Sequence, residues 1–198
     1  MTTVATHGFL SAESAKSVEV FEKTYAPLCR FYREVGAFAH RAKYEFQGGP
    51  RNLRHILVAS LFGRALSAYE SVFLLASRGM NLDSEASLRT LVETTLYALA
   101  VDKSDENASK VVGAAEIERL KHIRRLQKYG SLSEEDRKSL ASLEGIVAAD
   151  VVAKKYKNIQ LSEVADWAGE PWLYALPYSK LCMSTHPSAR RLGDALYQ

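Results

Sequence analysis

The chain has 198 residues, of which 47% are hydrophobic and 25% are charged, and its formal net charge is +3. These proportions are typical of a globular domain, and they exclude a disordered chain, a collagen-like fibre and a small disulfide scaffold. A chain of this length buries roughly 70% of its unfolded surface, so it can form a core without disulfides or structural metal. The net charge is small compared with that of a dedicated nucleic-acid binder.

Cysteine usage and hydropathy indicate the compartment. Cys29 and Cys182 lie far apart and lack metal-ligand spacing, which favours a reduced cytosolic environment. Residues 1–10 have no basic stretch and no long apolar run, unlike a secretory signal. The most apolar stretch contains Arg64 and Glu70, and it falls short of the roughly 18 uninterrupted apolar residues of a membrane span. We therefore predict a cytoplasmic protein with no membrane partner, in which this stretch is a buried helix.

Apolar residues recur at three- and four-residue steps along most of the chain, which is the period of amphipathic helices. The pattern predicts a first helix over residues 14–46, which Pro27 should kink or divide because proline removes a donor and crowds the preceding turn. A break at 47–50 is followed by a long predicted helix over 51–78. Gly79 is expected to cap it, because a left-handed residue costs least without a β-carbon.

The next helix is predicted to begin with Asp83 or Ser84 as its N-cap and to end near Lys103. Because so short a turn joins it to the preceding helix, the two should pack antiparallel. A polar amphipathic helix is predicted over 107–129. Ser133-Glu-Glu-Asp136 has the form of a capping box and opens another helix toward Tyr156.

Shorter elements are predicted at the C-terminal end. One short helix covers 162–167 and is stopped by Gly169, and one or two pieces over 171–183 are broken at Pro177. The fold class is therefore all-α, a single-domain antiparallel helical bundle of about six to eight helices over residues 1–198. Its predicted parts are an N-terminal arm (1–50), a central hairpin (51–103), peripheral helices (104–160) and short helices that return to the hairpin (161–198).

The first candidate site is a stripe of charges on the predicted third long helix. Glu85, Arg89 and Glu93 are separated by steps of four, which places them on one helix face about a turn apart. The stripe is flanked by leucines, so it should lie near the core. Two surface ion pairs, an arginine that holds a neighbouring helix in register, and an anion site all fit this spacing. The spacing alone favours the structural role.

The second candidate is the segment around His186. A residue before proline is pushed out of the helical region, so His186 should sit in an extended link before Pro187. Hydroxyl side chains surround it, and Arg190 follows within about a turn. A functional histidine and a plain helix stop, with Pro187 at the first helical position, remain equally open.

A third candidate is the pair Arg33 and His40, which stand seven residues apart on one helical face. Arginine, six residues and histidine form one version of the motif of HEPN ribonucleases. In those enzymes the histidine takes the 2′-hydroxyl proton and the arginine steadies charge on the phosphate. The motif is short, and here it lies near the N-terminus instead of in a late helix.

Two segments together resemble a known family. The first runs from Arg64-Ala-Leu-Ser-Ala-Tyr69 to Gly79 and then through 85–93, and the second contains Tyr178-Ser179 and His186-Pro187-Ser188. The pair resembles a bacterial and phage family known as the domain of unknown function number fifty-six seventy-seven, over about residues 56–192. The resemblance implies an all-helical fold but no particular activity, and it implies the convergence of six side chains: Arg64, Glu85, Arg89, Glu93, Ser179 and His186.

If these side chains converge, they form either a functional site or a structural network that holds the helices together. A carboxylate beside a histidine fixes its tautomer, as in general acid–base catalysis, whereas the same groups fully buried would lock helices together. We predict catalytic roles for His186, Arg89, Glu93 and Glu85, and binding roles for Arg64, Ser179 and Arg190. No metal or other cofactor is predicted.

Two classes of function follow. One is a metal-independent nuclease or hydrolase that acts on RNA or a nucleotide, in phage defence or a toxin system. The alternative is a non-enzymatic helical module that binds a protein or ligand, with the polar residues as a structural network. In that case the protein would form a homodimer through its aromatic end, because aromatic residues suit interface hot spots. The aromatic end comprises Trp167, Trp172, Tyr174 and Tyr178.

Overall fold

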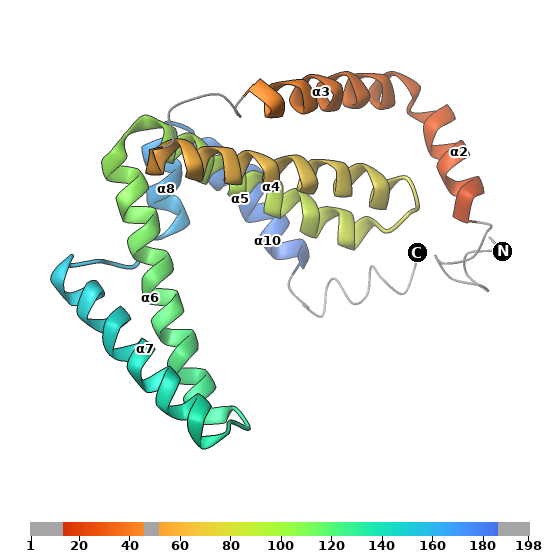
Figure 1. Ribbon diagram of the computed structural model, residues 1–198. Helices are drawn as coiled ribbons and strands as arrows, with labels where there is room; N and C mark the ends of the chain where they lie inside the picture. Colours follow the sequence, from red (N-terminus) through yellow and green to blue (C-terminus); the bar gives the residue numbers. More distant parts are fainter. Residues whose placement is uncertain (1–13, 46–51, 186–198) are drawn as a thin grey trace.

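Figure 1 shows the computed structural model of the chain, which describes residues 14–45 and 52–185. Within these two ranges every regular element is a helix and there is no strand. The predicted all-α fold class is therefore confirmed.

A long hairpin forms the centre of the molecule. Helices α4 (Leu53–Ala76) and α5 (Asn81–Lys103) run antiparallel along each other (Figure 1). Gly79 takes the expected left-handed conformation in the turn, with φ of 77°, which only glycine adopts without cost. Asn52 caps α4, because its side chain accepts a hydrogen bond from the backbone of His55 at 2.9 Å.

The predicted start of α5 is wrong. The helix begins at Asn81, with Met80 at its N-cap position, so Asp83 lies in its first turn instead of capping it. Ser84 is buried, and its hydroxyl donates to the carbonyl of Val72 on α4 at 3.1 Å. The tight hairpin turn thus draws this serine into the contact between the two helices.

Helix α4 is less buried than its sequence indicates. Among its residues only Leu66 and Ala68 are buried, so the expectation of a buried helix is wrong for most of its length. By length and composition alone, Leu53–Ala76 is the one helix of the described chain that could cross a membrane. A core helix of a soluble protein passes the same test.

The N-terminal arm comprises α2 (Ser14–Thr24) and α3 (Ala26–Glu45). The division near Pro27 agrees with the sequence, and the proline itself lies in the first turn of α3, where its missing N–H is not needed. Helix α3 lies alongside α4 on the outside of the molecule (Figure 1).

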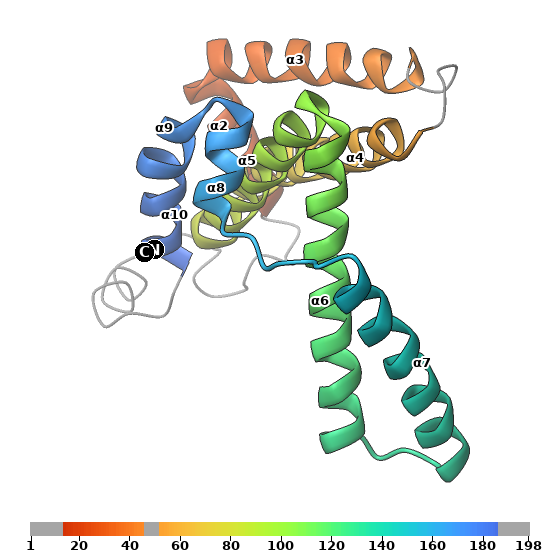
Figure 2. The same cartoon turned by 90° about the vertical axis from the view of Figure 1, so that its left-hand side faces the viewer.

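A second hairpin projects away from the first. Helix α6 (Asp105–Tyr129) leaves α5 at Ser104, and α7 (Glu134–Ala153) packs back along its far half (Figure 2). The predicted capping box is present: Ser133 and Asp136 hydrogen bond reciprocally at the start of α7. The two helices share a small core of Leu120, Ile123 and Val147.

Short helices cover α5 at the C-terminal end. Gly169 ends the first of them, as predicted, and it has a left-handed conformation. The predicted break at Pro177 is wrong, because a π-helical turn accommodates the proline and the chain remains helical. The wider turn relieves the clash of the ring with the preceding turn. The elements are α8 (Leu161–Ala168), α9 (Pro171–Leu173), η2 (Tyr174–Tyr178) and α10 (Ser179–Thr185).

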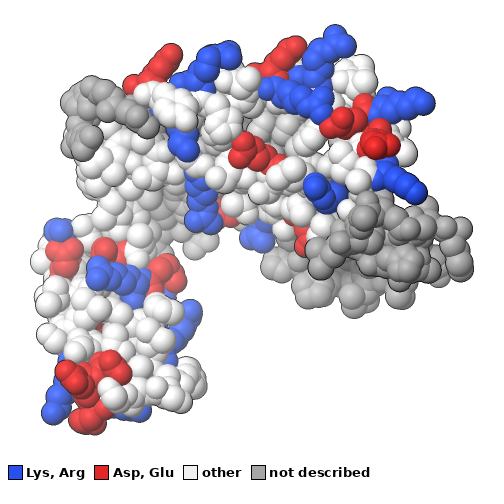
Figure 3. Space-filling model, turned by 45° about the vertical axis from the view of Figure 1, so that its right-hand side comes forward, with Lys and Arg blue, Asp and Glu red and all other residues white. Residues whose placement is uncertain are grey.

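The main core lies between α5 and α8, and it is made of Leu96, Ala100, Val164, Ala165 and Ala168. The surface in Figure 3 carries acidic and basic side chains close to each other, with no large area of one sign. Affinity of this face for a polyanion therefore depends on local groups instead of a broad electrostatic field.

Candidate functional site

One polar cluster joins α5 to the C-terminal helices. Arg89 donates from Nη2 to the hydroxyl of Tyr178 at 3.1 Å, and its guanidinium carbon lies 5.3 Å from the centre of the same ring. The hydrogen bond to Tyr178 raises the pKa of Arg89, and burial raises the pKa of Tyr178. The Nε of Arg89 is buried and has no hydrogen-bond partner among the described residues.

The two glutamates of the stripe flank this arginine. Glu85 and Glu93 are half-buried one turn on either side of Arg89, and the charge of Glu93 adds to the rise in the pKa of Arg89. Glu93 also lines a pocket of about 390 Å³ between α4, α5 and α6, together with Arg64 and Tyr97. Glu93 thus lies one turn from Arg89 on α5 and shares this pocket with Arg64, whereas Arg89 is not among the residues that line it.

Three predicted site residues remain, namely Ser179, His186 and Arg190. The hydroxyl of Ser179 donates to the carbonyl of Tyr174 at 2.9 Å, so it stabilises the π-helical turn. His186 and Arg190 lie outside the described residues. The helix that ends just before them, α10, packs against α5.

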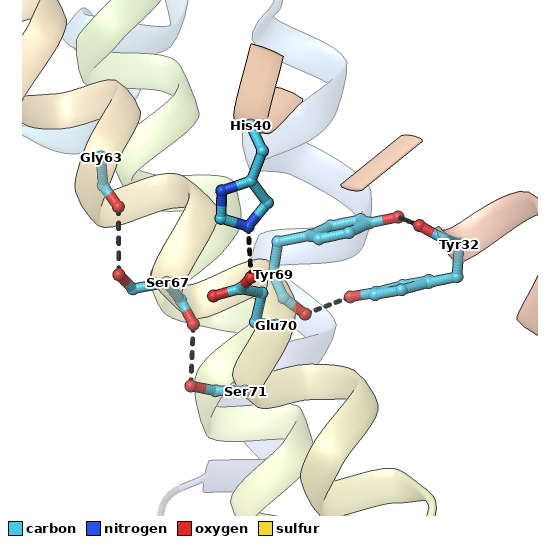
Figure 4. Close-up of polar contacts among 7 residues, drawn as sticks. All are labelled: Tyr32, His40, Gly63, Ser67, Tyr69, Glu70 and Ser71. Atoms are coloured by element: carbon cyan, nitrogen blue, oxygen red, sulfur yellow. Dashed lines mark hydrogen bonds and ion pairs between the residues drawn. The ribbon is translucent and has the colours of Figure 1, made fainter. Parts of the chain in front are cut away.

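A second polar cluster lies between α3 and α4 (Figure 4). The Nε2 of His40 lies 2.6 Å from Oε1 of Glu70, and both side chains are about half exposed. His40 makes no other hydrogen bond within the described part of the chain, and Figure 4 shows its second ring nitrogen turned away from the glutamate. A histidine held by a carboxylate in this way has a fixed tautomer.

Two tyrosines hold the helices together beside this pair. The rings of Tyr32 and Tyr69 stack with centroids 3.8 Å apart. Tyr69 donates to the backbone carbonyl of Tyr32 at 2.7 Å, and Tyr32 donates to that of Tyr69 (Figure 4). Burial raises the pKa of both hydroxyls, so both donate as neutral groups.

Arg33 completes the second cluster. It forms an ion pair with Glu22 of α2, and its guanidinium lies 5.8 Å from the ring centre of Phe73. Arg33, His40 and Glu70 line one pocket of about 450 Å³ together with the tyrosine pair. The spacing of seven thus places both members of the Arg33–His40 pair at a common pocket.

Sequence reasoning missed several residues of both clusters. Glu70 is 30 residues from His40, and no local pattern connects two separate helices. Tyr178 was part of the motif around Ser179, but its contact with Arg89 depends on how α10 packs. Among the residues that the structure describes, no group of three or more His, Cys, Asp or Glu side chains could hold a metal ion.

The fold and the two clusters define an all-helical protein whose polar groups lie between packed helices. A family of unknown function (DUF5677) matches residues 55–196, and the chain belongs to this family. No curated protein and no solved structure matches the chain. The matched region includes Glu70 and the Arg89–Tyr178 contact, whereas Arg33 and His40 on α3 precede it.

Proposed function

We propose that the protein is a metal-independent nuclease that cleaves RNA or a nucleotide, with its reacting groups in the pocket between α3 and α4. The observation that carries the proposal is the 2.6 Å contact between His40 and Glu70 at a pocket that Arg33 also lines. This combination supplies an oriented base together with the guanidinium of Arg33, which is paired with Glu22, and a base and a positive charge both promote phosphodiester cleavage.

Each residue has a distinct role in this proposal. His40 takes the proton of a ribose 2′-hydroxyl through its free ring nitrogen, and Glu70 stabilises the imidazolium that forms. The 2′-oxygen bonds to phosphorus as the bond to the 5′-oxygen breaks, and the leaving oxygen takes a proton from water. Arg33 stabilises the charge on the phosphate. The products carry a 2′,3′-cyclic phosphate and a 5′-hydroxyl.

The stripe on α5 supports the second candidate function, a non-enzymatic helical module. Arg89 is already bonded to Tyr178 across two elements, which is how a structural lock behaves. In this case Glu85 and Glu93 balance the charge of Arg89, and the predicted contribution of His186 and Arg190 concerns residues outside the described ranges. The alternative catalytic assignment, in which His186 is the base beside Arg89, remains a prediction.

To decide between His40 and His186 as the catalytic base, each histidine is replaced by alanine and cleavage of a labelled single-stranded RNA is measured in excess EDTA. His40→Ala should lower the cleavage rate about 100-fold or more, because a positioned histidine contributes roughly 10²–10⁴-fold. The matched control is His122→Ala, since His122 is an exposed histidine on α6. That variant should keep the wild-type rate.

Other outcomes would overturn the proposal in identifiable ways. A wild-type rate for His40→Ala, with loss of activity in His186→Ala, would move the site to α5. No cleavage by the wild-type protein would leave the non-enzymatic module. Because the His40 side chain is half exposed, its removal should leave the melting temperature nearly unchanged.

A further inference from the structure

A third cavity, rich in lysine, lies on another part of the molecule. Its volume is about 550 Å³, and it is formed by the start of α6, the end of α7, the connection over residues 154–160, and α8. Figure 2 shows this connection passing close to α6 on its way to α8. Neither the His40 pocket nor the Arg89 cluster contributes to the lining, which includes Lys110, Lys154, Lys155, Lys157 and Trp167.

The backbone of Lys155 is unusual. It has a positive φ of 53°, and it is the one non-glycine residue with positive φ in the described chain. Its N–H donates to the carbonyl of Val152 at 3.1 Å, which ends α7. The same left-handed position is occupied by Gly79 and Gly169 at two other helix ends. Glycine would be less strained here, so a lysine at this position has an energetic cost, and such strained positions are enriched at functional sites.

The connection that carries the lysines is anchored to α6. Gly113 is buried, and a β-carbon placed on it would lie 2.3 Å from the ring of Tyr156. The absence of a side chain at Gly113 therefore lets the Tyr156 ring pack directly on the helix backbone. This contact fixes the residues on both sides of Tyr156, Lys155 and Lys157, in position.

The charges of the cavity are only partly balanced. Lys110 pairs with Glu106 at 2.7 Å, and Lys154 pairs with Asp150 at 2.9 Å. The carboxylate of Glu163 accepts from the backbone N–H of Gln160 at 2.7 Å. Lys155 and Lys157 have no ion-pair or hydrogen-bond partner within residues 14–45 and 52–185. Two ammonium groups on a fixed connection are thus available to an anion.

Trp167 lines the same cavity as Lys155 and Lys157. Trp167 packs against the α5–α8 core on one side and lines the cavity on the other. The Nζ of Lys110 lies 5.0 Å from the centre of its ring. The cavity volume falls within the roughly 300–1,000 Å³ range of small-ligand sites.

We propose that this cavity binds a nucleoside diphosphate, with the phosphates at Lys155 and Lys157 and the base along Trp167. Two cations on a fixed turn suit a pyrophosphate group, and an indole offers a flat surface to a base. The proposal depends on observations that are independent of the nuclease site.

Calorimetric titration of the full chain with ADP, inorganic pyrophosphate and adenosine tests the proposal. ADP should bind more tightly than either fragment, and its affinity should fall as salt rises. Lys155→Gly and Lys157→Gln should each weaken ADP binding about tenfold, which corresponds to one lost charge-assisted contact. The matched control is Lys138→Gln, an exposed lysine at the other end of α7, which should bind ADP as the wild type does.

The Lys155→Gly variant separates a binding role from a capping role. Glycine suits the positive φ, so its melting temperature should equal or exceed that of the wild type while ADP binding falls. Unchanged ADP binding in this variant would overturn the proposal, as would no ADP binding to the wild type at about 1 mM, the weak end of specific affinity. Equal affinity for ADP and pyrophosphate would overturn the placement of the base. The His40→Ala variant should bind ADP as the wild type does. The ADP-binding proposal can therefore be refuted without refuting the nuclease proposal, and the reverse also holds.

Discussion

At the scale of single residues, Arg89 shows how one side chain connects distant parts of the chain. Its guanidinium reaches 89 positions along the sequence to the hydroxyl of Tyr178, while its own Nε is buried without a described partner. A buried donor that lacks a partner costs free energy. The bond from Nη2 to Tyr178 and the nearby charge of Glu93 both stabilise the charged guanidinium, whereas Nε stays without a described partner.

Tyr178→Phe tests this interpretation. The substitution keeps the ring and removes the hydroxyl, so the guanidinium keeps its ring contact and loses its hydrogen bond, and the contact of the hydroxyl with Cys182 is lost as well. We expect the free energy of unfolding to fall by about 2 kcal/mol, because hydrogen bonds to charged groups contribute roughly 1.5–3 kcal/mol. Urea denaturation followed by circular dichroism measures the change.

The neighbouring Tyr174 provides the control. Its ring stacks on that of Tyr178 with centroids 5.6 Å apart, but no hydrogen bond of its hydroxyl is found among the described residues. Tyr174→Phe should therefore change the free energy of unfolding by less than about 0.5 kcal/mol, as most substitutions without a lost partner do. A Tyr178→Phe variant as stable as the wild type would show that Arg89 is not held by this hydroxyl.

The residue scale also shows what the sequence could predict. The shared face of Glu85, Arg89 and Glu93 follows from helical spacing and is correct. The pairing of His40 with Glu70 could not be predicted, because it depends on the packing of α3 on α4. Local periodicity predicts which side chains share a helix face, but not which face of another helix they meet.

At the scale of elements, the connection over residues 154–160 depends on a glycine in another helix. Gly113→Ala would place a β-carbon 2.3 Å from Cδ1 and 2.6 Å from Cγ of Tyr156. The ring must move, which should lower the free energy of unfolding by about 1–3 kcal/mol. It should also weaken ADP binding, since Lys155 and Lys157 flank the displaced tyrosine. Denaturation and calorimetry of the same variant measure both effects.

Gly145 of α7 is the matched control. A β-carbon there meets no atom within 4 Å, so Gly145→Ala should stabilise the helix by roughly 0.5–1 kcal/mol. The glycine-to-alanine substitution is thus expected to lower the free energy of unfolding at Gly113 and to raise it at Gly145. If Gly113→Ala were also stabilising, the close packing of Tyr156 on α6 would be wrong.

The helix ends also show that predictions succeed where local residues decide the structure and fail where other contacts decide it. The capping box of Ser133 and Asp136 and the end of α8 at Gly169 are predicted correctly, because each involves only residues within one turn. The start of α5 is wrong because Ser84 bonds to α4 instead of capping its own helix. The predicted helix break at Pro177 is wrong because a π-helical turn, stabilised by Ser179, accommodates the proline.

At the scale of the whole molecule, helix α3 exposes several large apolar side chains that no described contact covers. At the aromatic end, the predicted homodimer contact, Trp167 and Tyr174 pack on the main core, whereas Trp172 is 56% exposed. On α3, by contrast, Leu28, Phe31 and Phe38 are 54%, 63% and 65% exposed. We define the α3 seam by five residues with coiled-coil spacing: Leu28, Phe31, Val35, Phe38 and Ala42.

The α3 seam is complementary to a second, antiparallel copy of itself. In that arrangement Phe38 faces Val35 of the other copy and Phe31 faces its Ala42, so large residues meet small ones. Glu34 and Arg41 flank the seam on one side, seven residues apart, and each would face the opposite charge of the other copy. A parallel pair would place Glu34 beside Ala39 instead, so the charges favour an antiparallel pairing.

We therefore expect the protein to dimerise through the α3 seam, measured by sedimentation velocity. Phe38→Glu should give a monomer, whereas Tyr44→Glu, which alters an equally exposed ring off the seam, should leave the dimer intact. Arg41→Glu should weaken the dimer through like charges at Glu34, and the swapped variant Glu34→Arg with Arg41→Glu should restore it. A non-specific apolar contact would not respond to the swap, and a wild-type monomer at high concentration would contradict self-pairing altogether. Recovery by the swap would thus establish both the partner and its antiparallel direction.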